Sequence, residues 1–472
     1  MNFTILSHAG LSVEHNGVRI VSDPWLIGSC YWRSWWNFPE PPSSLLENLT
    51  TDYIYLTHLH WDHFHGASLK KLFPPNIRIL VPKVPTKRMV LDLNYLGFHN
   101  ITEIPHGGMI QLGEDFTFHS YQFGPGVDSA MVLQGGGITL FNCNDCKHFG
   151  LPLRQITNKF PKIDFVLRSN SNASAVPYCI KGYETLFPDF RLPQDYIEEF
   201  SRFSLFVGAR YAIPFASNHC FLHKETFQYN SKAVMAEDIP SYYQQLASEY
   251  NRKSECMVMV PGSHWSQSDG FKIVPFDYEK KDVYIQGLLL RYKGKLLEQY
   301  EKEDAACADF NLFQTYFKGF FNAIPFFMRK WMKSPIVFRT DDKRGEHHWQ
   351  LNIEAGTVSV LQTAPTGNDH IILETPALVL NDCARIRMFS TWTPSKRLSI
   401  VLPSQAHLKQ LRLLFQLLDL YEVDILPLSK NFSIRSMLNH ALRWREAVEL
   451  IRLIVKHKVL GHPFVPAHLY PL

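Results

Sequence analysis

The fold is decided by the stretch Thr57-His58-Leu59-His60-Trp61-Asp62-His63-Phe64-His65-Gly66. It follows Asp52-Tyr53-Ile54-Tyr55-Leu56, which is apolar enough to form a buried strand that ends in a polar loop. If the strand continues, its two-residue period places both imidazoles of the His-x-His pair on one face. The turn that follows aims Asp62 and His63 at a neighbouring point. The pattern predicts a site for two metal ions side by side.

Packing alone explains this motif poorly. The chain has 21 histidines in 472 residues, so isolated ones such as His15, His99 and His457 are expected to be surface groups or satisfied core groups. The ligand-type residues of the motif are crowded together, and each would need its own buried partner. Imidazole and carboxylate ligands suit zinc or iron, and we therefore predict a metal site here.

The composition is that of an ordinary globular protein, with 46% hydrophobic and 19% charged residues. A net charge of +4 is too small to indicate nucleic acid as a partner. The first eight residues lack the basic and apolar regions of a secretory signal, so we expect a cytoplasmic protein. Its eight cysteines are then expected to be free thiols.

The segment from Asn311 to Lys333 is rich in aromatic residues. Lys318, Pro325 and Arg329 interrupt it, so it is a poor transmembrane helix and we expect no transmembrane segment. A helix packed between domains is the favoured interpretation. A helix that lies on a membrane surface, or a lid over a hydrophobic substrate, is the alternative.

The length predicts two or three domains. Short strands alternate with helices in the first half, which indicates an α/β domain over residues 1–270. We place a helical, aromatic-rich connector at 271–335 and a C-terminal α+β domain at 336–472. Within the first domain, the predicted strand Ile138 to Asn142 delivers Asp145 to a strand end, as the motif's strand does for His58.

The metal motif after a hydrophobic strand is the signature of the metallo-β-lactamase fold. Further stretches resemble the metallo-β-lactamase-like part of the CMP-N-acetylneuraminate hydroxylase family: Asp23 to Gly28, Trp35-Trp36, Glu40-Pro41-Pro42, Asn142 to Cys146 and Arg210 to Ala216. The resemblance implies an αββα sandwich followed by the C-terminal domain. The chain starts directly at the first predicted strand, so we expect the family's Rieske domain to be absent.

The resemblance also implies a set of metal ligands, which in this sequence are His58, His60, Asp62, His63, Asp145 and His223. His219 is the alternative to His223 as the last ligand along the chain, because it lies nearer a strand end. The resemblance also implies a histidine ligand between His63 and Asp145, but its expected position is near Gly124, which has no side chain. His119 and Asp128 are the alternatives for this ligand. If neither serves, the first metal is under-coordinated or lost.

Three functions use these residues, with Asp62 and Asp145 as the catalytic carboxylates. The first is an iron oxygenase or oxidase acting on a small molecule, which the resemblance to a hydroxylase favours and which requires an external electron donor. The second is a two-zinc hydrolase of a phosphoester, lactone or amide. The third is a binding protein with a vestigial metal site.

Three cations on predicted loops are candidates for holding an anionic substrate group, or are surface charges: Arg33, Arg168 and Lys147.

Overall fold

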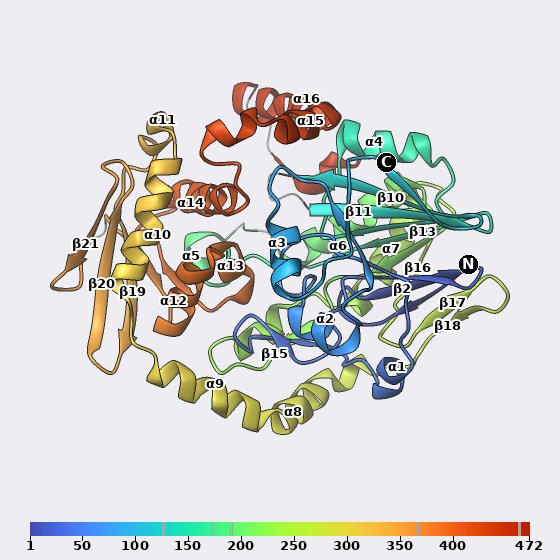
Figure 1. Ribbon diagram of the computed structural model, residues 1–472, viewed down its shortest axis with the longest axis horizontal. Helices are drawn as coiled ribbons and strands as arrows, with labels where there is room; N and C mark the ends of the chain where they lie inside the picture. Colours follow the sequence, from blue (N-terminus) through green and yellow to red (C-terminus); the bar gives the residue numbers. More distant parts are fainter. Residues whose placement is uncertain (125–127, 172, 189, 191, 366–368, 461–463) are drawn as a thin grey trace.

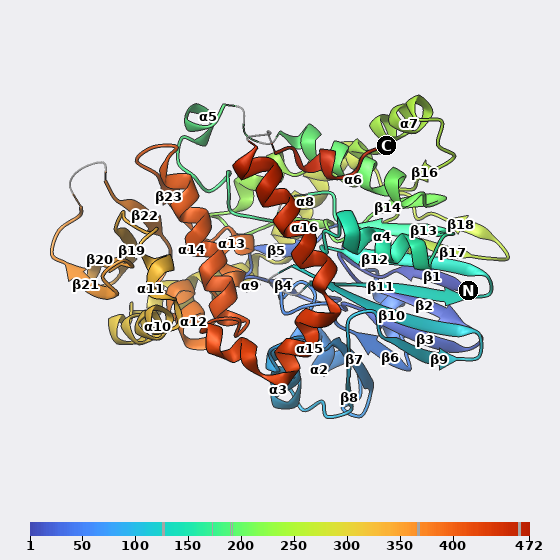
Figure 2. The same ribbon diagram turned by 90° about the horizontal axis from the view of Figure 1, so that it is seen from above.

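The computed structural model describes residues 1–124, 128–171, 173–188, 190, 192–365, 369–460 and 464–472. In the first part of the chain two large sheets pack face to face, with helices on both outer sides (Figure 1). A second, smaller part is built around its own sheet and lies beside the first (Figure 2).

The first large sheet has its strands in the order β18-β17-β1-β2-β3-β6-β7-β8. Their bounds are β18 Gly270–Lys272, β17 His264–Ser266, β1 Asn2–Ile5, β2 Leu11–His15, β3 Val18–Ser22, β6 Tyr53–Tyr55, β7 Arg78–Pro82 and β8 Ile101–Ile104. β3, β6, β7 and β8 are parallel neighbours. Every residue of β6 is buried, as expected for a central parallel strand covered on both faces.

The second large sheet has the order β16-β14-β13-β12-β11-β10-β9. Its strands are β16 Glu255–Cys256, β14 Tyr211–Pro214, β13 Phe165–Arg168, β12 Ile138–Asn144, β11 Asp128–Gly135, β10 Phe116–Phe123 and β9 Met109–Gly113. Gly136 and Gly137 join β11 to β12 with φ of +59° and +74°. A hairpin turn of this kind requires positive φ at both positions, which glycine adopts without strain.

Three apolar layers hold this part together. Side chains of both sheets, such as Phe3 and Phe165, meet between the sheets. α1 (Ser43–Glu47), α2 (Gly66–Leu72) and α3 (Arg88–Tyr95) pack on the first sheet. α4 (Gly150–Lys159), α6 (Pro193–Val207) and α7 (Pro240–Glu249) pack on the second. This arrangement confirms the predicted αββα sandwich.

A small third sheet lies at one end of the sandwich, in the order β15-β5-β4. Its strands are β15 (His219–Phe221), β5 (Trp35–Asn37) and β4 (Ser29–Cys30). The pairing of His219 with Asn37 and of Phe221 with Trp35 brings the tryptophan-rich loop against a histidine far away in the sequence.

The smaller part has a sheet in the order β21-β20-β19-β22-β23, preceded and covered by helices. Its strands are β19 Ile336–Asp342, β20 Gly345–Asn352, β21 Thr357–Leu361, β22 Ile371–Glu374 and β23 Ser399–Val401. The helices of the smaller part are α8 Lys281–Arg291, α9 Lys293–Ala305, α10 Phe310–Ala323, α11 Phe326–Arg329, α12 Ala377–Ile386, α13 Trp392–Ser395 and α14 His407–Glu422. The short helix α5 (Tyr183–Leu186) belongs to the first part.

α10 is a packed helix, because Phe313, Phe317 and Phe320 are buried against the sheet and α14. The first part of the aromatic segment is thus a packed helix, but within the smaller part of the molecule, whereas Phe326, Phe327 and Trp331 at its end are exposed. Among the described residues, no helix has both the length and the apolar character needed to cross a membrane.

The last helices, α15 (Ile434–Leu442) and α16 (Trp444–Ile454), return to the first part of the chain. Arg443 donates to the carbonyl of Gly124 at 2.8 Å, and Asn439 donates to the carbonyl of Lys83 at 2.9 Å. The predicted 336–472 segment is therefore divided in space between two packing partners. We had no sequence signal for this return.

Candidate metal centre

The residues of the metal motif form a loop between β6 and α2, at one edge of the sandwich. Other polar residues follow the ends of strands at the same edge. His8 comes after β1, Asp23 directly after β3, and Asp145 directly after β12. β1, β3 and β6 run in the same direction, so their carboxyl ends meet. Strand ends thus gather side chains from three distant stretches of sequence.

His63 lies at the centre of the cluster. Its Nε2 is 3.4 Å from Oδ2 of Asp62 and 3.3 Å from Oδ2 of Asp145. Two groups of potential ligands share it, each with its ligand atoms within 4.8 Å of one another. One group is His8, Asp62 and His63, and the other is His58, His63 and Asp145. Two ligand groups that meet in one residue suit two neighbouring cations.

Asp23 fixes the orientation of His63. Its Oδ2 accepts from Nδ1 of His63 at 2.8 Å and from the Asn144 amide at 2.6 Å. The same carboxylate accepts from the backbone and hydroxyl of Thr57 at 2.8 and 2.7 Å. A carboxylate that holds one nitrogen of a histidine leaves the other nitrogen aimed at a metal. Asp23 therefore acts as a positioning residue behind the cluster.

The two histidines of the His-x-His pair face one another. Nε2 of His58 lies 2.9 Å from Nδ1 of His60. Burial is the largest influence on both groups, and it lowers the pKa of each to about 4. Both imidazoles are therefore neutral at neutral pH, which is the form that binds a metal.

The charges of the centre do not balance without a cation. Asp23, Asp62 and Asp145 lie around His63, with His8 also beside Asp62, and no lysine or arginine of the described residues forms an ion pair with them. Burial opposes charge on His63, yet the nearby carboxylates outweigh burial and raise its pKa well above the usual value. Burial likewise opposes the charge on Asp145, but the hydrogen bond from His63 lowers its pKa to about 2.

Nitrogen atoms in the cluster are also short of partners. Nε2 of His8 and Nε2 of His63 are buried and form no hydrogen bond of regular geometry, although both point at carboxylates. Uncompensated buried carboxylates and unpaired buried nitrogens are both costly in a protein interior. A bound divalent cation would relieve both, so the donor set fits a metal.

An aromatic wall encloses the centre. The Tyr31 hydroxyl donates to Asp62, and the Tyr31 ring stacks on Trp61 at 5.8 Å. Trp35 stacks on His219 at 3.6 Å between ring centroids. Tyr31, Trp32 and Arg33 adopt φ of 55°, 53° and 63°, a left-handed turn that is strained for residues other than glycine. The tryptophan-rich loop, residues 31–36, thus forms part of the site.

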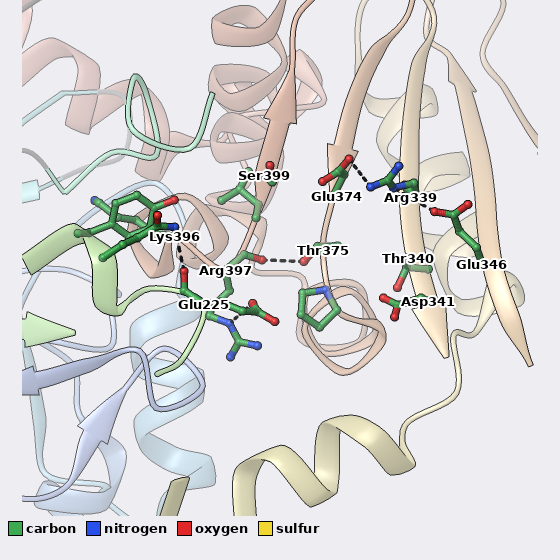
Figure 3. A pocket seen from close by; sticks show the side chains of 14 residues that line it. Glu225, Arg339, Thr340, Asp341, Glu346, Glu374, Thr375, Lys396, Arg397 and Ser399 are labelled. Atoms are coloured by element: carbon green, nitrogen blue, oxygen red, sulfur yellow. Dashed lines mark hydrogen bonds and ion pairs between the residues drawn. The ribbon is translucent and has the colours of Figure 1, made fainter. Parts of the chain in front are cut away.

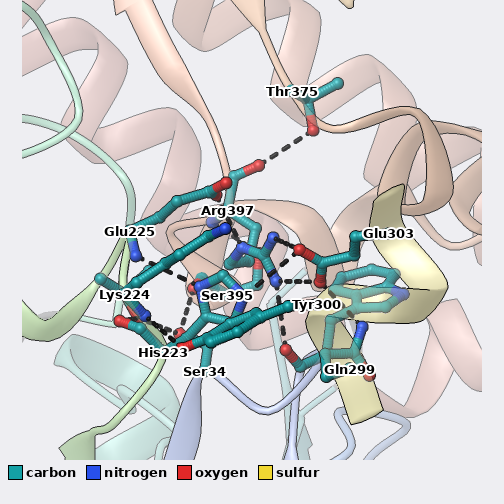
Figure 4. Close-up of polar contacts among 12 residues, drawn as sticks. Ser34, His223, Lys224, Glu225, Gln299, Tyr300, Glu303, Thr375, Ser395 and Arg397 are labelled. Carbon is teal, nitrogen blue, oxygen red and sulfur yellow. Dashed lines mark hydrogen bonds and ion pairs between the residues drawn. The ribbon is translucent and has the colours of Figure 1, made fainter. Parts of the chain in front are cut away.

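The structure separates the two candidates for the last ligand, His223 and His219. Nε2 of His223 lies 3.3 Å from Oε2 of Glu303 in a separate buried cluster, in which Arg397 holds both Glu303 and Glu225 (Figure 4). The structure thus places His223 with Glu303 and Arg397 and not among the grouped ligand atoms around His63. His219 is nearer the centre, with its ring 5.3 Å from that of His8. The offset from the preceding strand was the wrong guide because β15 begins at His219 and the chain then turns away.

Of the two alternatives to Gly124, the structure brings Asp128 to the centre. Burial raises the pKa of Asp128, and His60 and Asp145 are among the groups that influence its charge. His119 lies five residues before Gly124 on β10, where its Nδ1 is 3.3 Å from Nζ of Lys159 and its ring packs on Phe160. His119 therefore faces the α4 side of the sheet and is apart from the cluster.

His8 is the participant that sequence reasoning missed. Nothing distinguishes Leu6-Ser7-His8-Ala9-Gly10 from other lone histidines, which are expected to be packing or surface groups. The only available signal was its position just after a predicted strand. Asp23 was noticed only as part of a resemblance, with no role.

Two of the three cations considered for an anionic substrate group, Arg168 and Arg33, have partners of their own. Arg168 is fully buried, pairs with Glu199 at 2.8 Å and lies over the Phe203 ring at 4.1 Å. It also donates to the Tyr470 hydroxyl at 3.2 Å, so it anchors the C-terminus. Arg33 donates to Ser29 at 3.3 Å. The prediction that Arg168 binds substrate is therefore wrong.

Two cavities lie near these clusters. One of about 440 Å³ adjoins the metal centre, with His60 on its wall and Tyr196, Arg412, Phe415 and Asp419 around it. The other, of about 450 Å³, lies along β19 and β22 (Figure 3). Its charged lining is already paired, for example Arg339 with Glu374 at 2.6 Å. Of these two cavities, the first reaches a histidine of the metal motif, His60.

No family model matches the chain. It is 36% identical over 154 residues to the cytidine monophosphate-N-acetylneuraminic acid hydroxylase of Mus musculus, which covers 31% of this chain and 26% of that protein. It is 27% identical over 280 residues to a Mycolicibacterium smegmatis protein described as a Rieske 2Fe-2S iron–sulfur protein, covering 56% and 53% of the two chains. The chain thus spans between about a quarter and about half of these relatives.

Among solved structures, the isothiocyanate hydrolase from Delia radicum gut bacteria matches 56% of this chain and 99% of its own, at 15% identity and a TM-score of 0.41. The sheet order, the His-x-His-x-Asp-His loop at the strand ends and the sequence match lead to one conclusion. The chain has a metallo-β-lactamase type of fold and is similar to part of CMP-N-acetylneuraminic acid hydroxylase.

Proposed function

We propose that the chain is a metal-dependent oxygenase or oxidase that acts on a small molecule. The observation that carries the proposal is the buried pair of ligand groups sharing His63, next to the cavity at His60. The sequence similarity to a hydroxylase supports an oxidative reaction over other reactions of the same ligands.

The proposed ligands are the residues gathered at the strand ends: His8, His58, His60, Asp62, His63 and Asp145, with His219 and Asp128 at the margin. Iron, the preferred metal, would supply the activation of dioxygen when bound, and imidazole with carboxylate ligation suits it. Electrons for such a reaction come from a separate donor, which is a proposed partner.

The chain's own residues prepare the site in three ways. Asp23 holds His63, and Tyr31 holds Asp62, so both ligands keep a single orientation. The aromatic wall excludes water from the His219 side. The cavity presents an apolar surface with Arg412 and Asp419, which suits a substrate that has both apolar and polar parts.

Purification under anaerobic conditions followed by metal analysis tests the proposal. We expect bound iron and reductant-dependent uptake of O₂, both lost in His63→Ala. His119→Ala is a matched control, because His119 is a buried histidine outside the cluster. Bound zinc with no O₂ uptake would contradict the oxygenase.

A two-zinc hydrolase is the second candidate, favoured by the meeting of both ligand groups at His63. It predicts zinc content and turnover of a phosphodiester, lactone or amide without a reductant. An absence of metal from protein that is folded and supplied with both metals would contradict both functions and leave a binding role.

A further inference from the structure

In α16 acidic side chains face the protein and apolar side chains are exposed, which is the reverse of an ordinary surface helix. Its acidic side chains face the protein: Glu446 accepts from the backbone of Gly124 at 3.0 Å, and Glu449 accepts from the backbone of Leu151 at 3.2 Å. Its outer side carries Ile451 and Ile454, which are 61% and 57% exposed. A surface helix normally buries its apolar stripe and exposes its charges. We call this outer side, with Trp444, the α16 patch.

The exposed charges beside the α16 patch are positive. Glu446 and Glu449 are the only acidic residues between 434 and 464, and both are turned inward and hydrogen bonded. Arg445 lies over the Trp444 ring at 4.8 Å, and Lys456 is exposed. Aromatic and aliphatic side chains next to cations are the combination found in helices that lie in a membrane interface.

α11 presents a second surface of the same chemistry, which we call the α11 patch. Phe326, Phe327 and Trp331 are all more than half exposed. Lys330 lies over the Phe326 ring at 4.8 Å, and no acidic residue occurs between 310 and 340. The helices α11 and α16 both lie along the upper edge of the molecule in Figure 1.

We propose that the α11 and α16 patches together dock the protein on an anionic phospholipid surface. Two separated apolar patches on helices along one edge of the molecule fit an extended plane. Positive charge on both patches favours anionic lipid headgroups. The same charge opposes a second copy of the chain, because a symmetric pair would bring like charges together. This inference is independent of the metal chemistry.

Vesicle flotation of the full chain tests the proposal, with phosphatidylcholine vesicles that contain or lack phosphatidylserine. We expect binding to the vesicles with phosphatidylserine, and a decrease when salt is added. Ile451→Asp with Ile454→Asp should reduce partitioning by roughly tenfold or more, because apolar area is lost and repulsion is gained. Phe327→Asp with Trp331→Asp should reduce it as well.

Val283→Asp with Leu290→Asp is the matched control. Both residues are highly exposed aliphatic side chains on α8, at the opposite edge of the molecule. This variant should bind as the unmodified protein does, and thermal unfolding checks that each variant is folded. Equal binding to both kinds of vesicle, or binding unaffected by the α16 changes, would overturn the proposal. A dimer that the α16 changes dissociate, without vesicle binding, would overturn it too and assign the face to a second copy.

Discussion

The metal centre and the cluster of His223, Glu303 and Arg397 both bring buried histidines and carboxylates together, and they differ in one respect. In the metal centre, His63 and its neighbours face Asp23, Asp62 and Asp145 without an arginine. In the second cluster, Arg397 donates to Glu303 at 2.8 and 2.9 Å and to Glu225 at 2.9 Å (Figure 4). The guanidinium satisfies the carboxylates permanently there, whereas the metal centre lacks a fixed cation.

The comparison teaches that residue types alone do not define a metal site. His223 and Glu303 have the chemistry of ligands, but Arg397 already forms ion pairs with both Glu303 and Glu225. The second cluster instead joins three parts of the chain, the loop after β15, α9 and the loop before β23. It is a structural junction between the two parts of the molecule.

The largest effect should come from His63→Ala. Because His63 belongs to both ligand groups, its loss should remove both metals, lowering affinity by about a hundredfold or more. Metal content by mass spectrometry measures the change. His223→Ala should retain its full metal content, and equal loss in the two variants would erase the distinction between the clusters.

Arg397→Ala should have the reverse outcome. It leaves Glu303 buried without its cation, which should destabilise the fold by about 3 to 5 kcal/mol. Chemical denaturation measures this, and metal content measured well below the transition should be unchanged. A variant that unfolds normally but loses metal would place Arg397 in the function of the metal centre.

The ligands at the margin of the centre should have intermediate effects. His219→Ala should lower the affinity for one metal by about tenfold to a hundredfold, and His223→Ala should not. Titration with a competing chelator separates the two. If only His223→Ala weakens metal binding, His223 and not His219 is the ligand.

Asp128→Asn and His119→Asn distinguish the two substitutes for the absent middle histidine. Asp128→Asn should weaken metal binding by about tenfold, because its charge acts on His60 and Asp145. His119→Asn should leave it unchanged, since its ring faces Lys159. Unaltered affinity in both variants would indicate a centre with one ligand fewer.

Metal binding should also depend on pH. The raised pKa of His63 means that a proton must leave before a metal binds, so affinity should increase by about tenfold per pH unit below that pKa. In the metal-free protein, stabilisation from the lowered pKa of Asp145 is present above its ordinary value and is lost as pH falls towards about 2. Chelator competition at several pH values measures the first effect, and a flat profile would contradict it.

Sequence reasoning found the fold and the centre of the site because both depend on local patterns. The His-x-His-x-Asp-His loop is contiguous and follows a strand whose apolar pattern is unambiguous. The strand before Asp145 was equally clear, so its place at the same sheet edge could be predicted. The packed aromatic helix α10 followed from its composition in the same way.

What sequence could not supply depends on contacts between distant parts of the chain. His8 and Asp23 join the centre because β1, β3 and β6 end at one edge, which sheet order alone determines. His223 leaves it because Arg397, far away in the sequence, compensates its carboxylate partners. Sequence by itself determined which side chains bind metals well. Tertiary structure decided which of these side chains have an arginine or lysine as an ion-pair partner and which do not, because the charge balance of a buried site depends on neighbours in space.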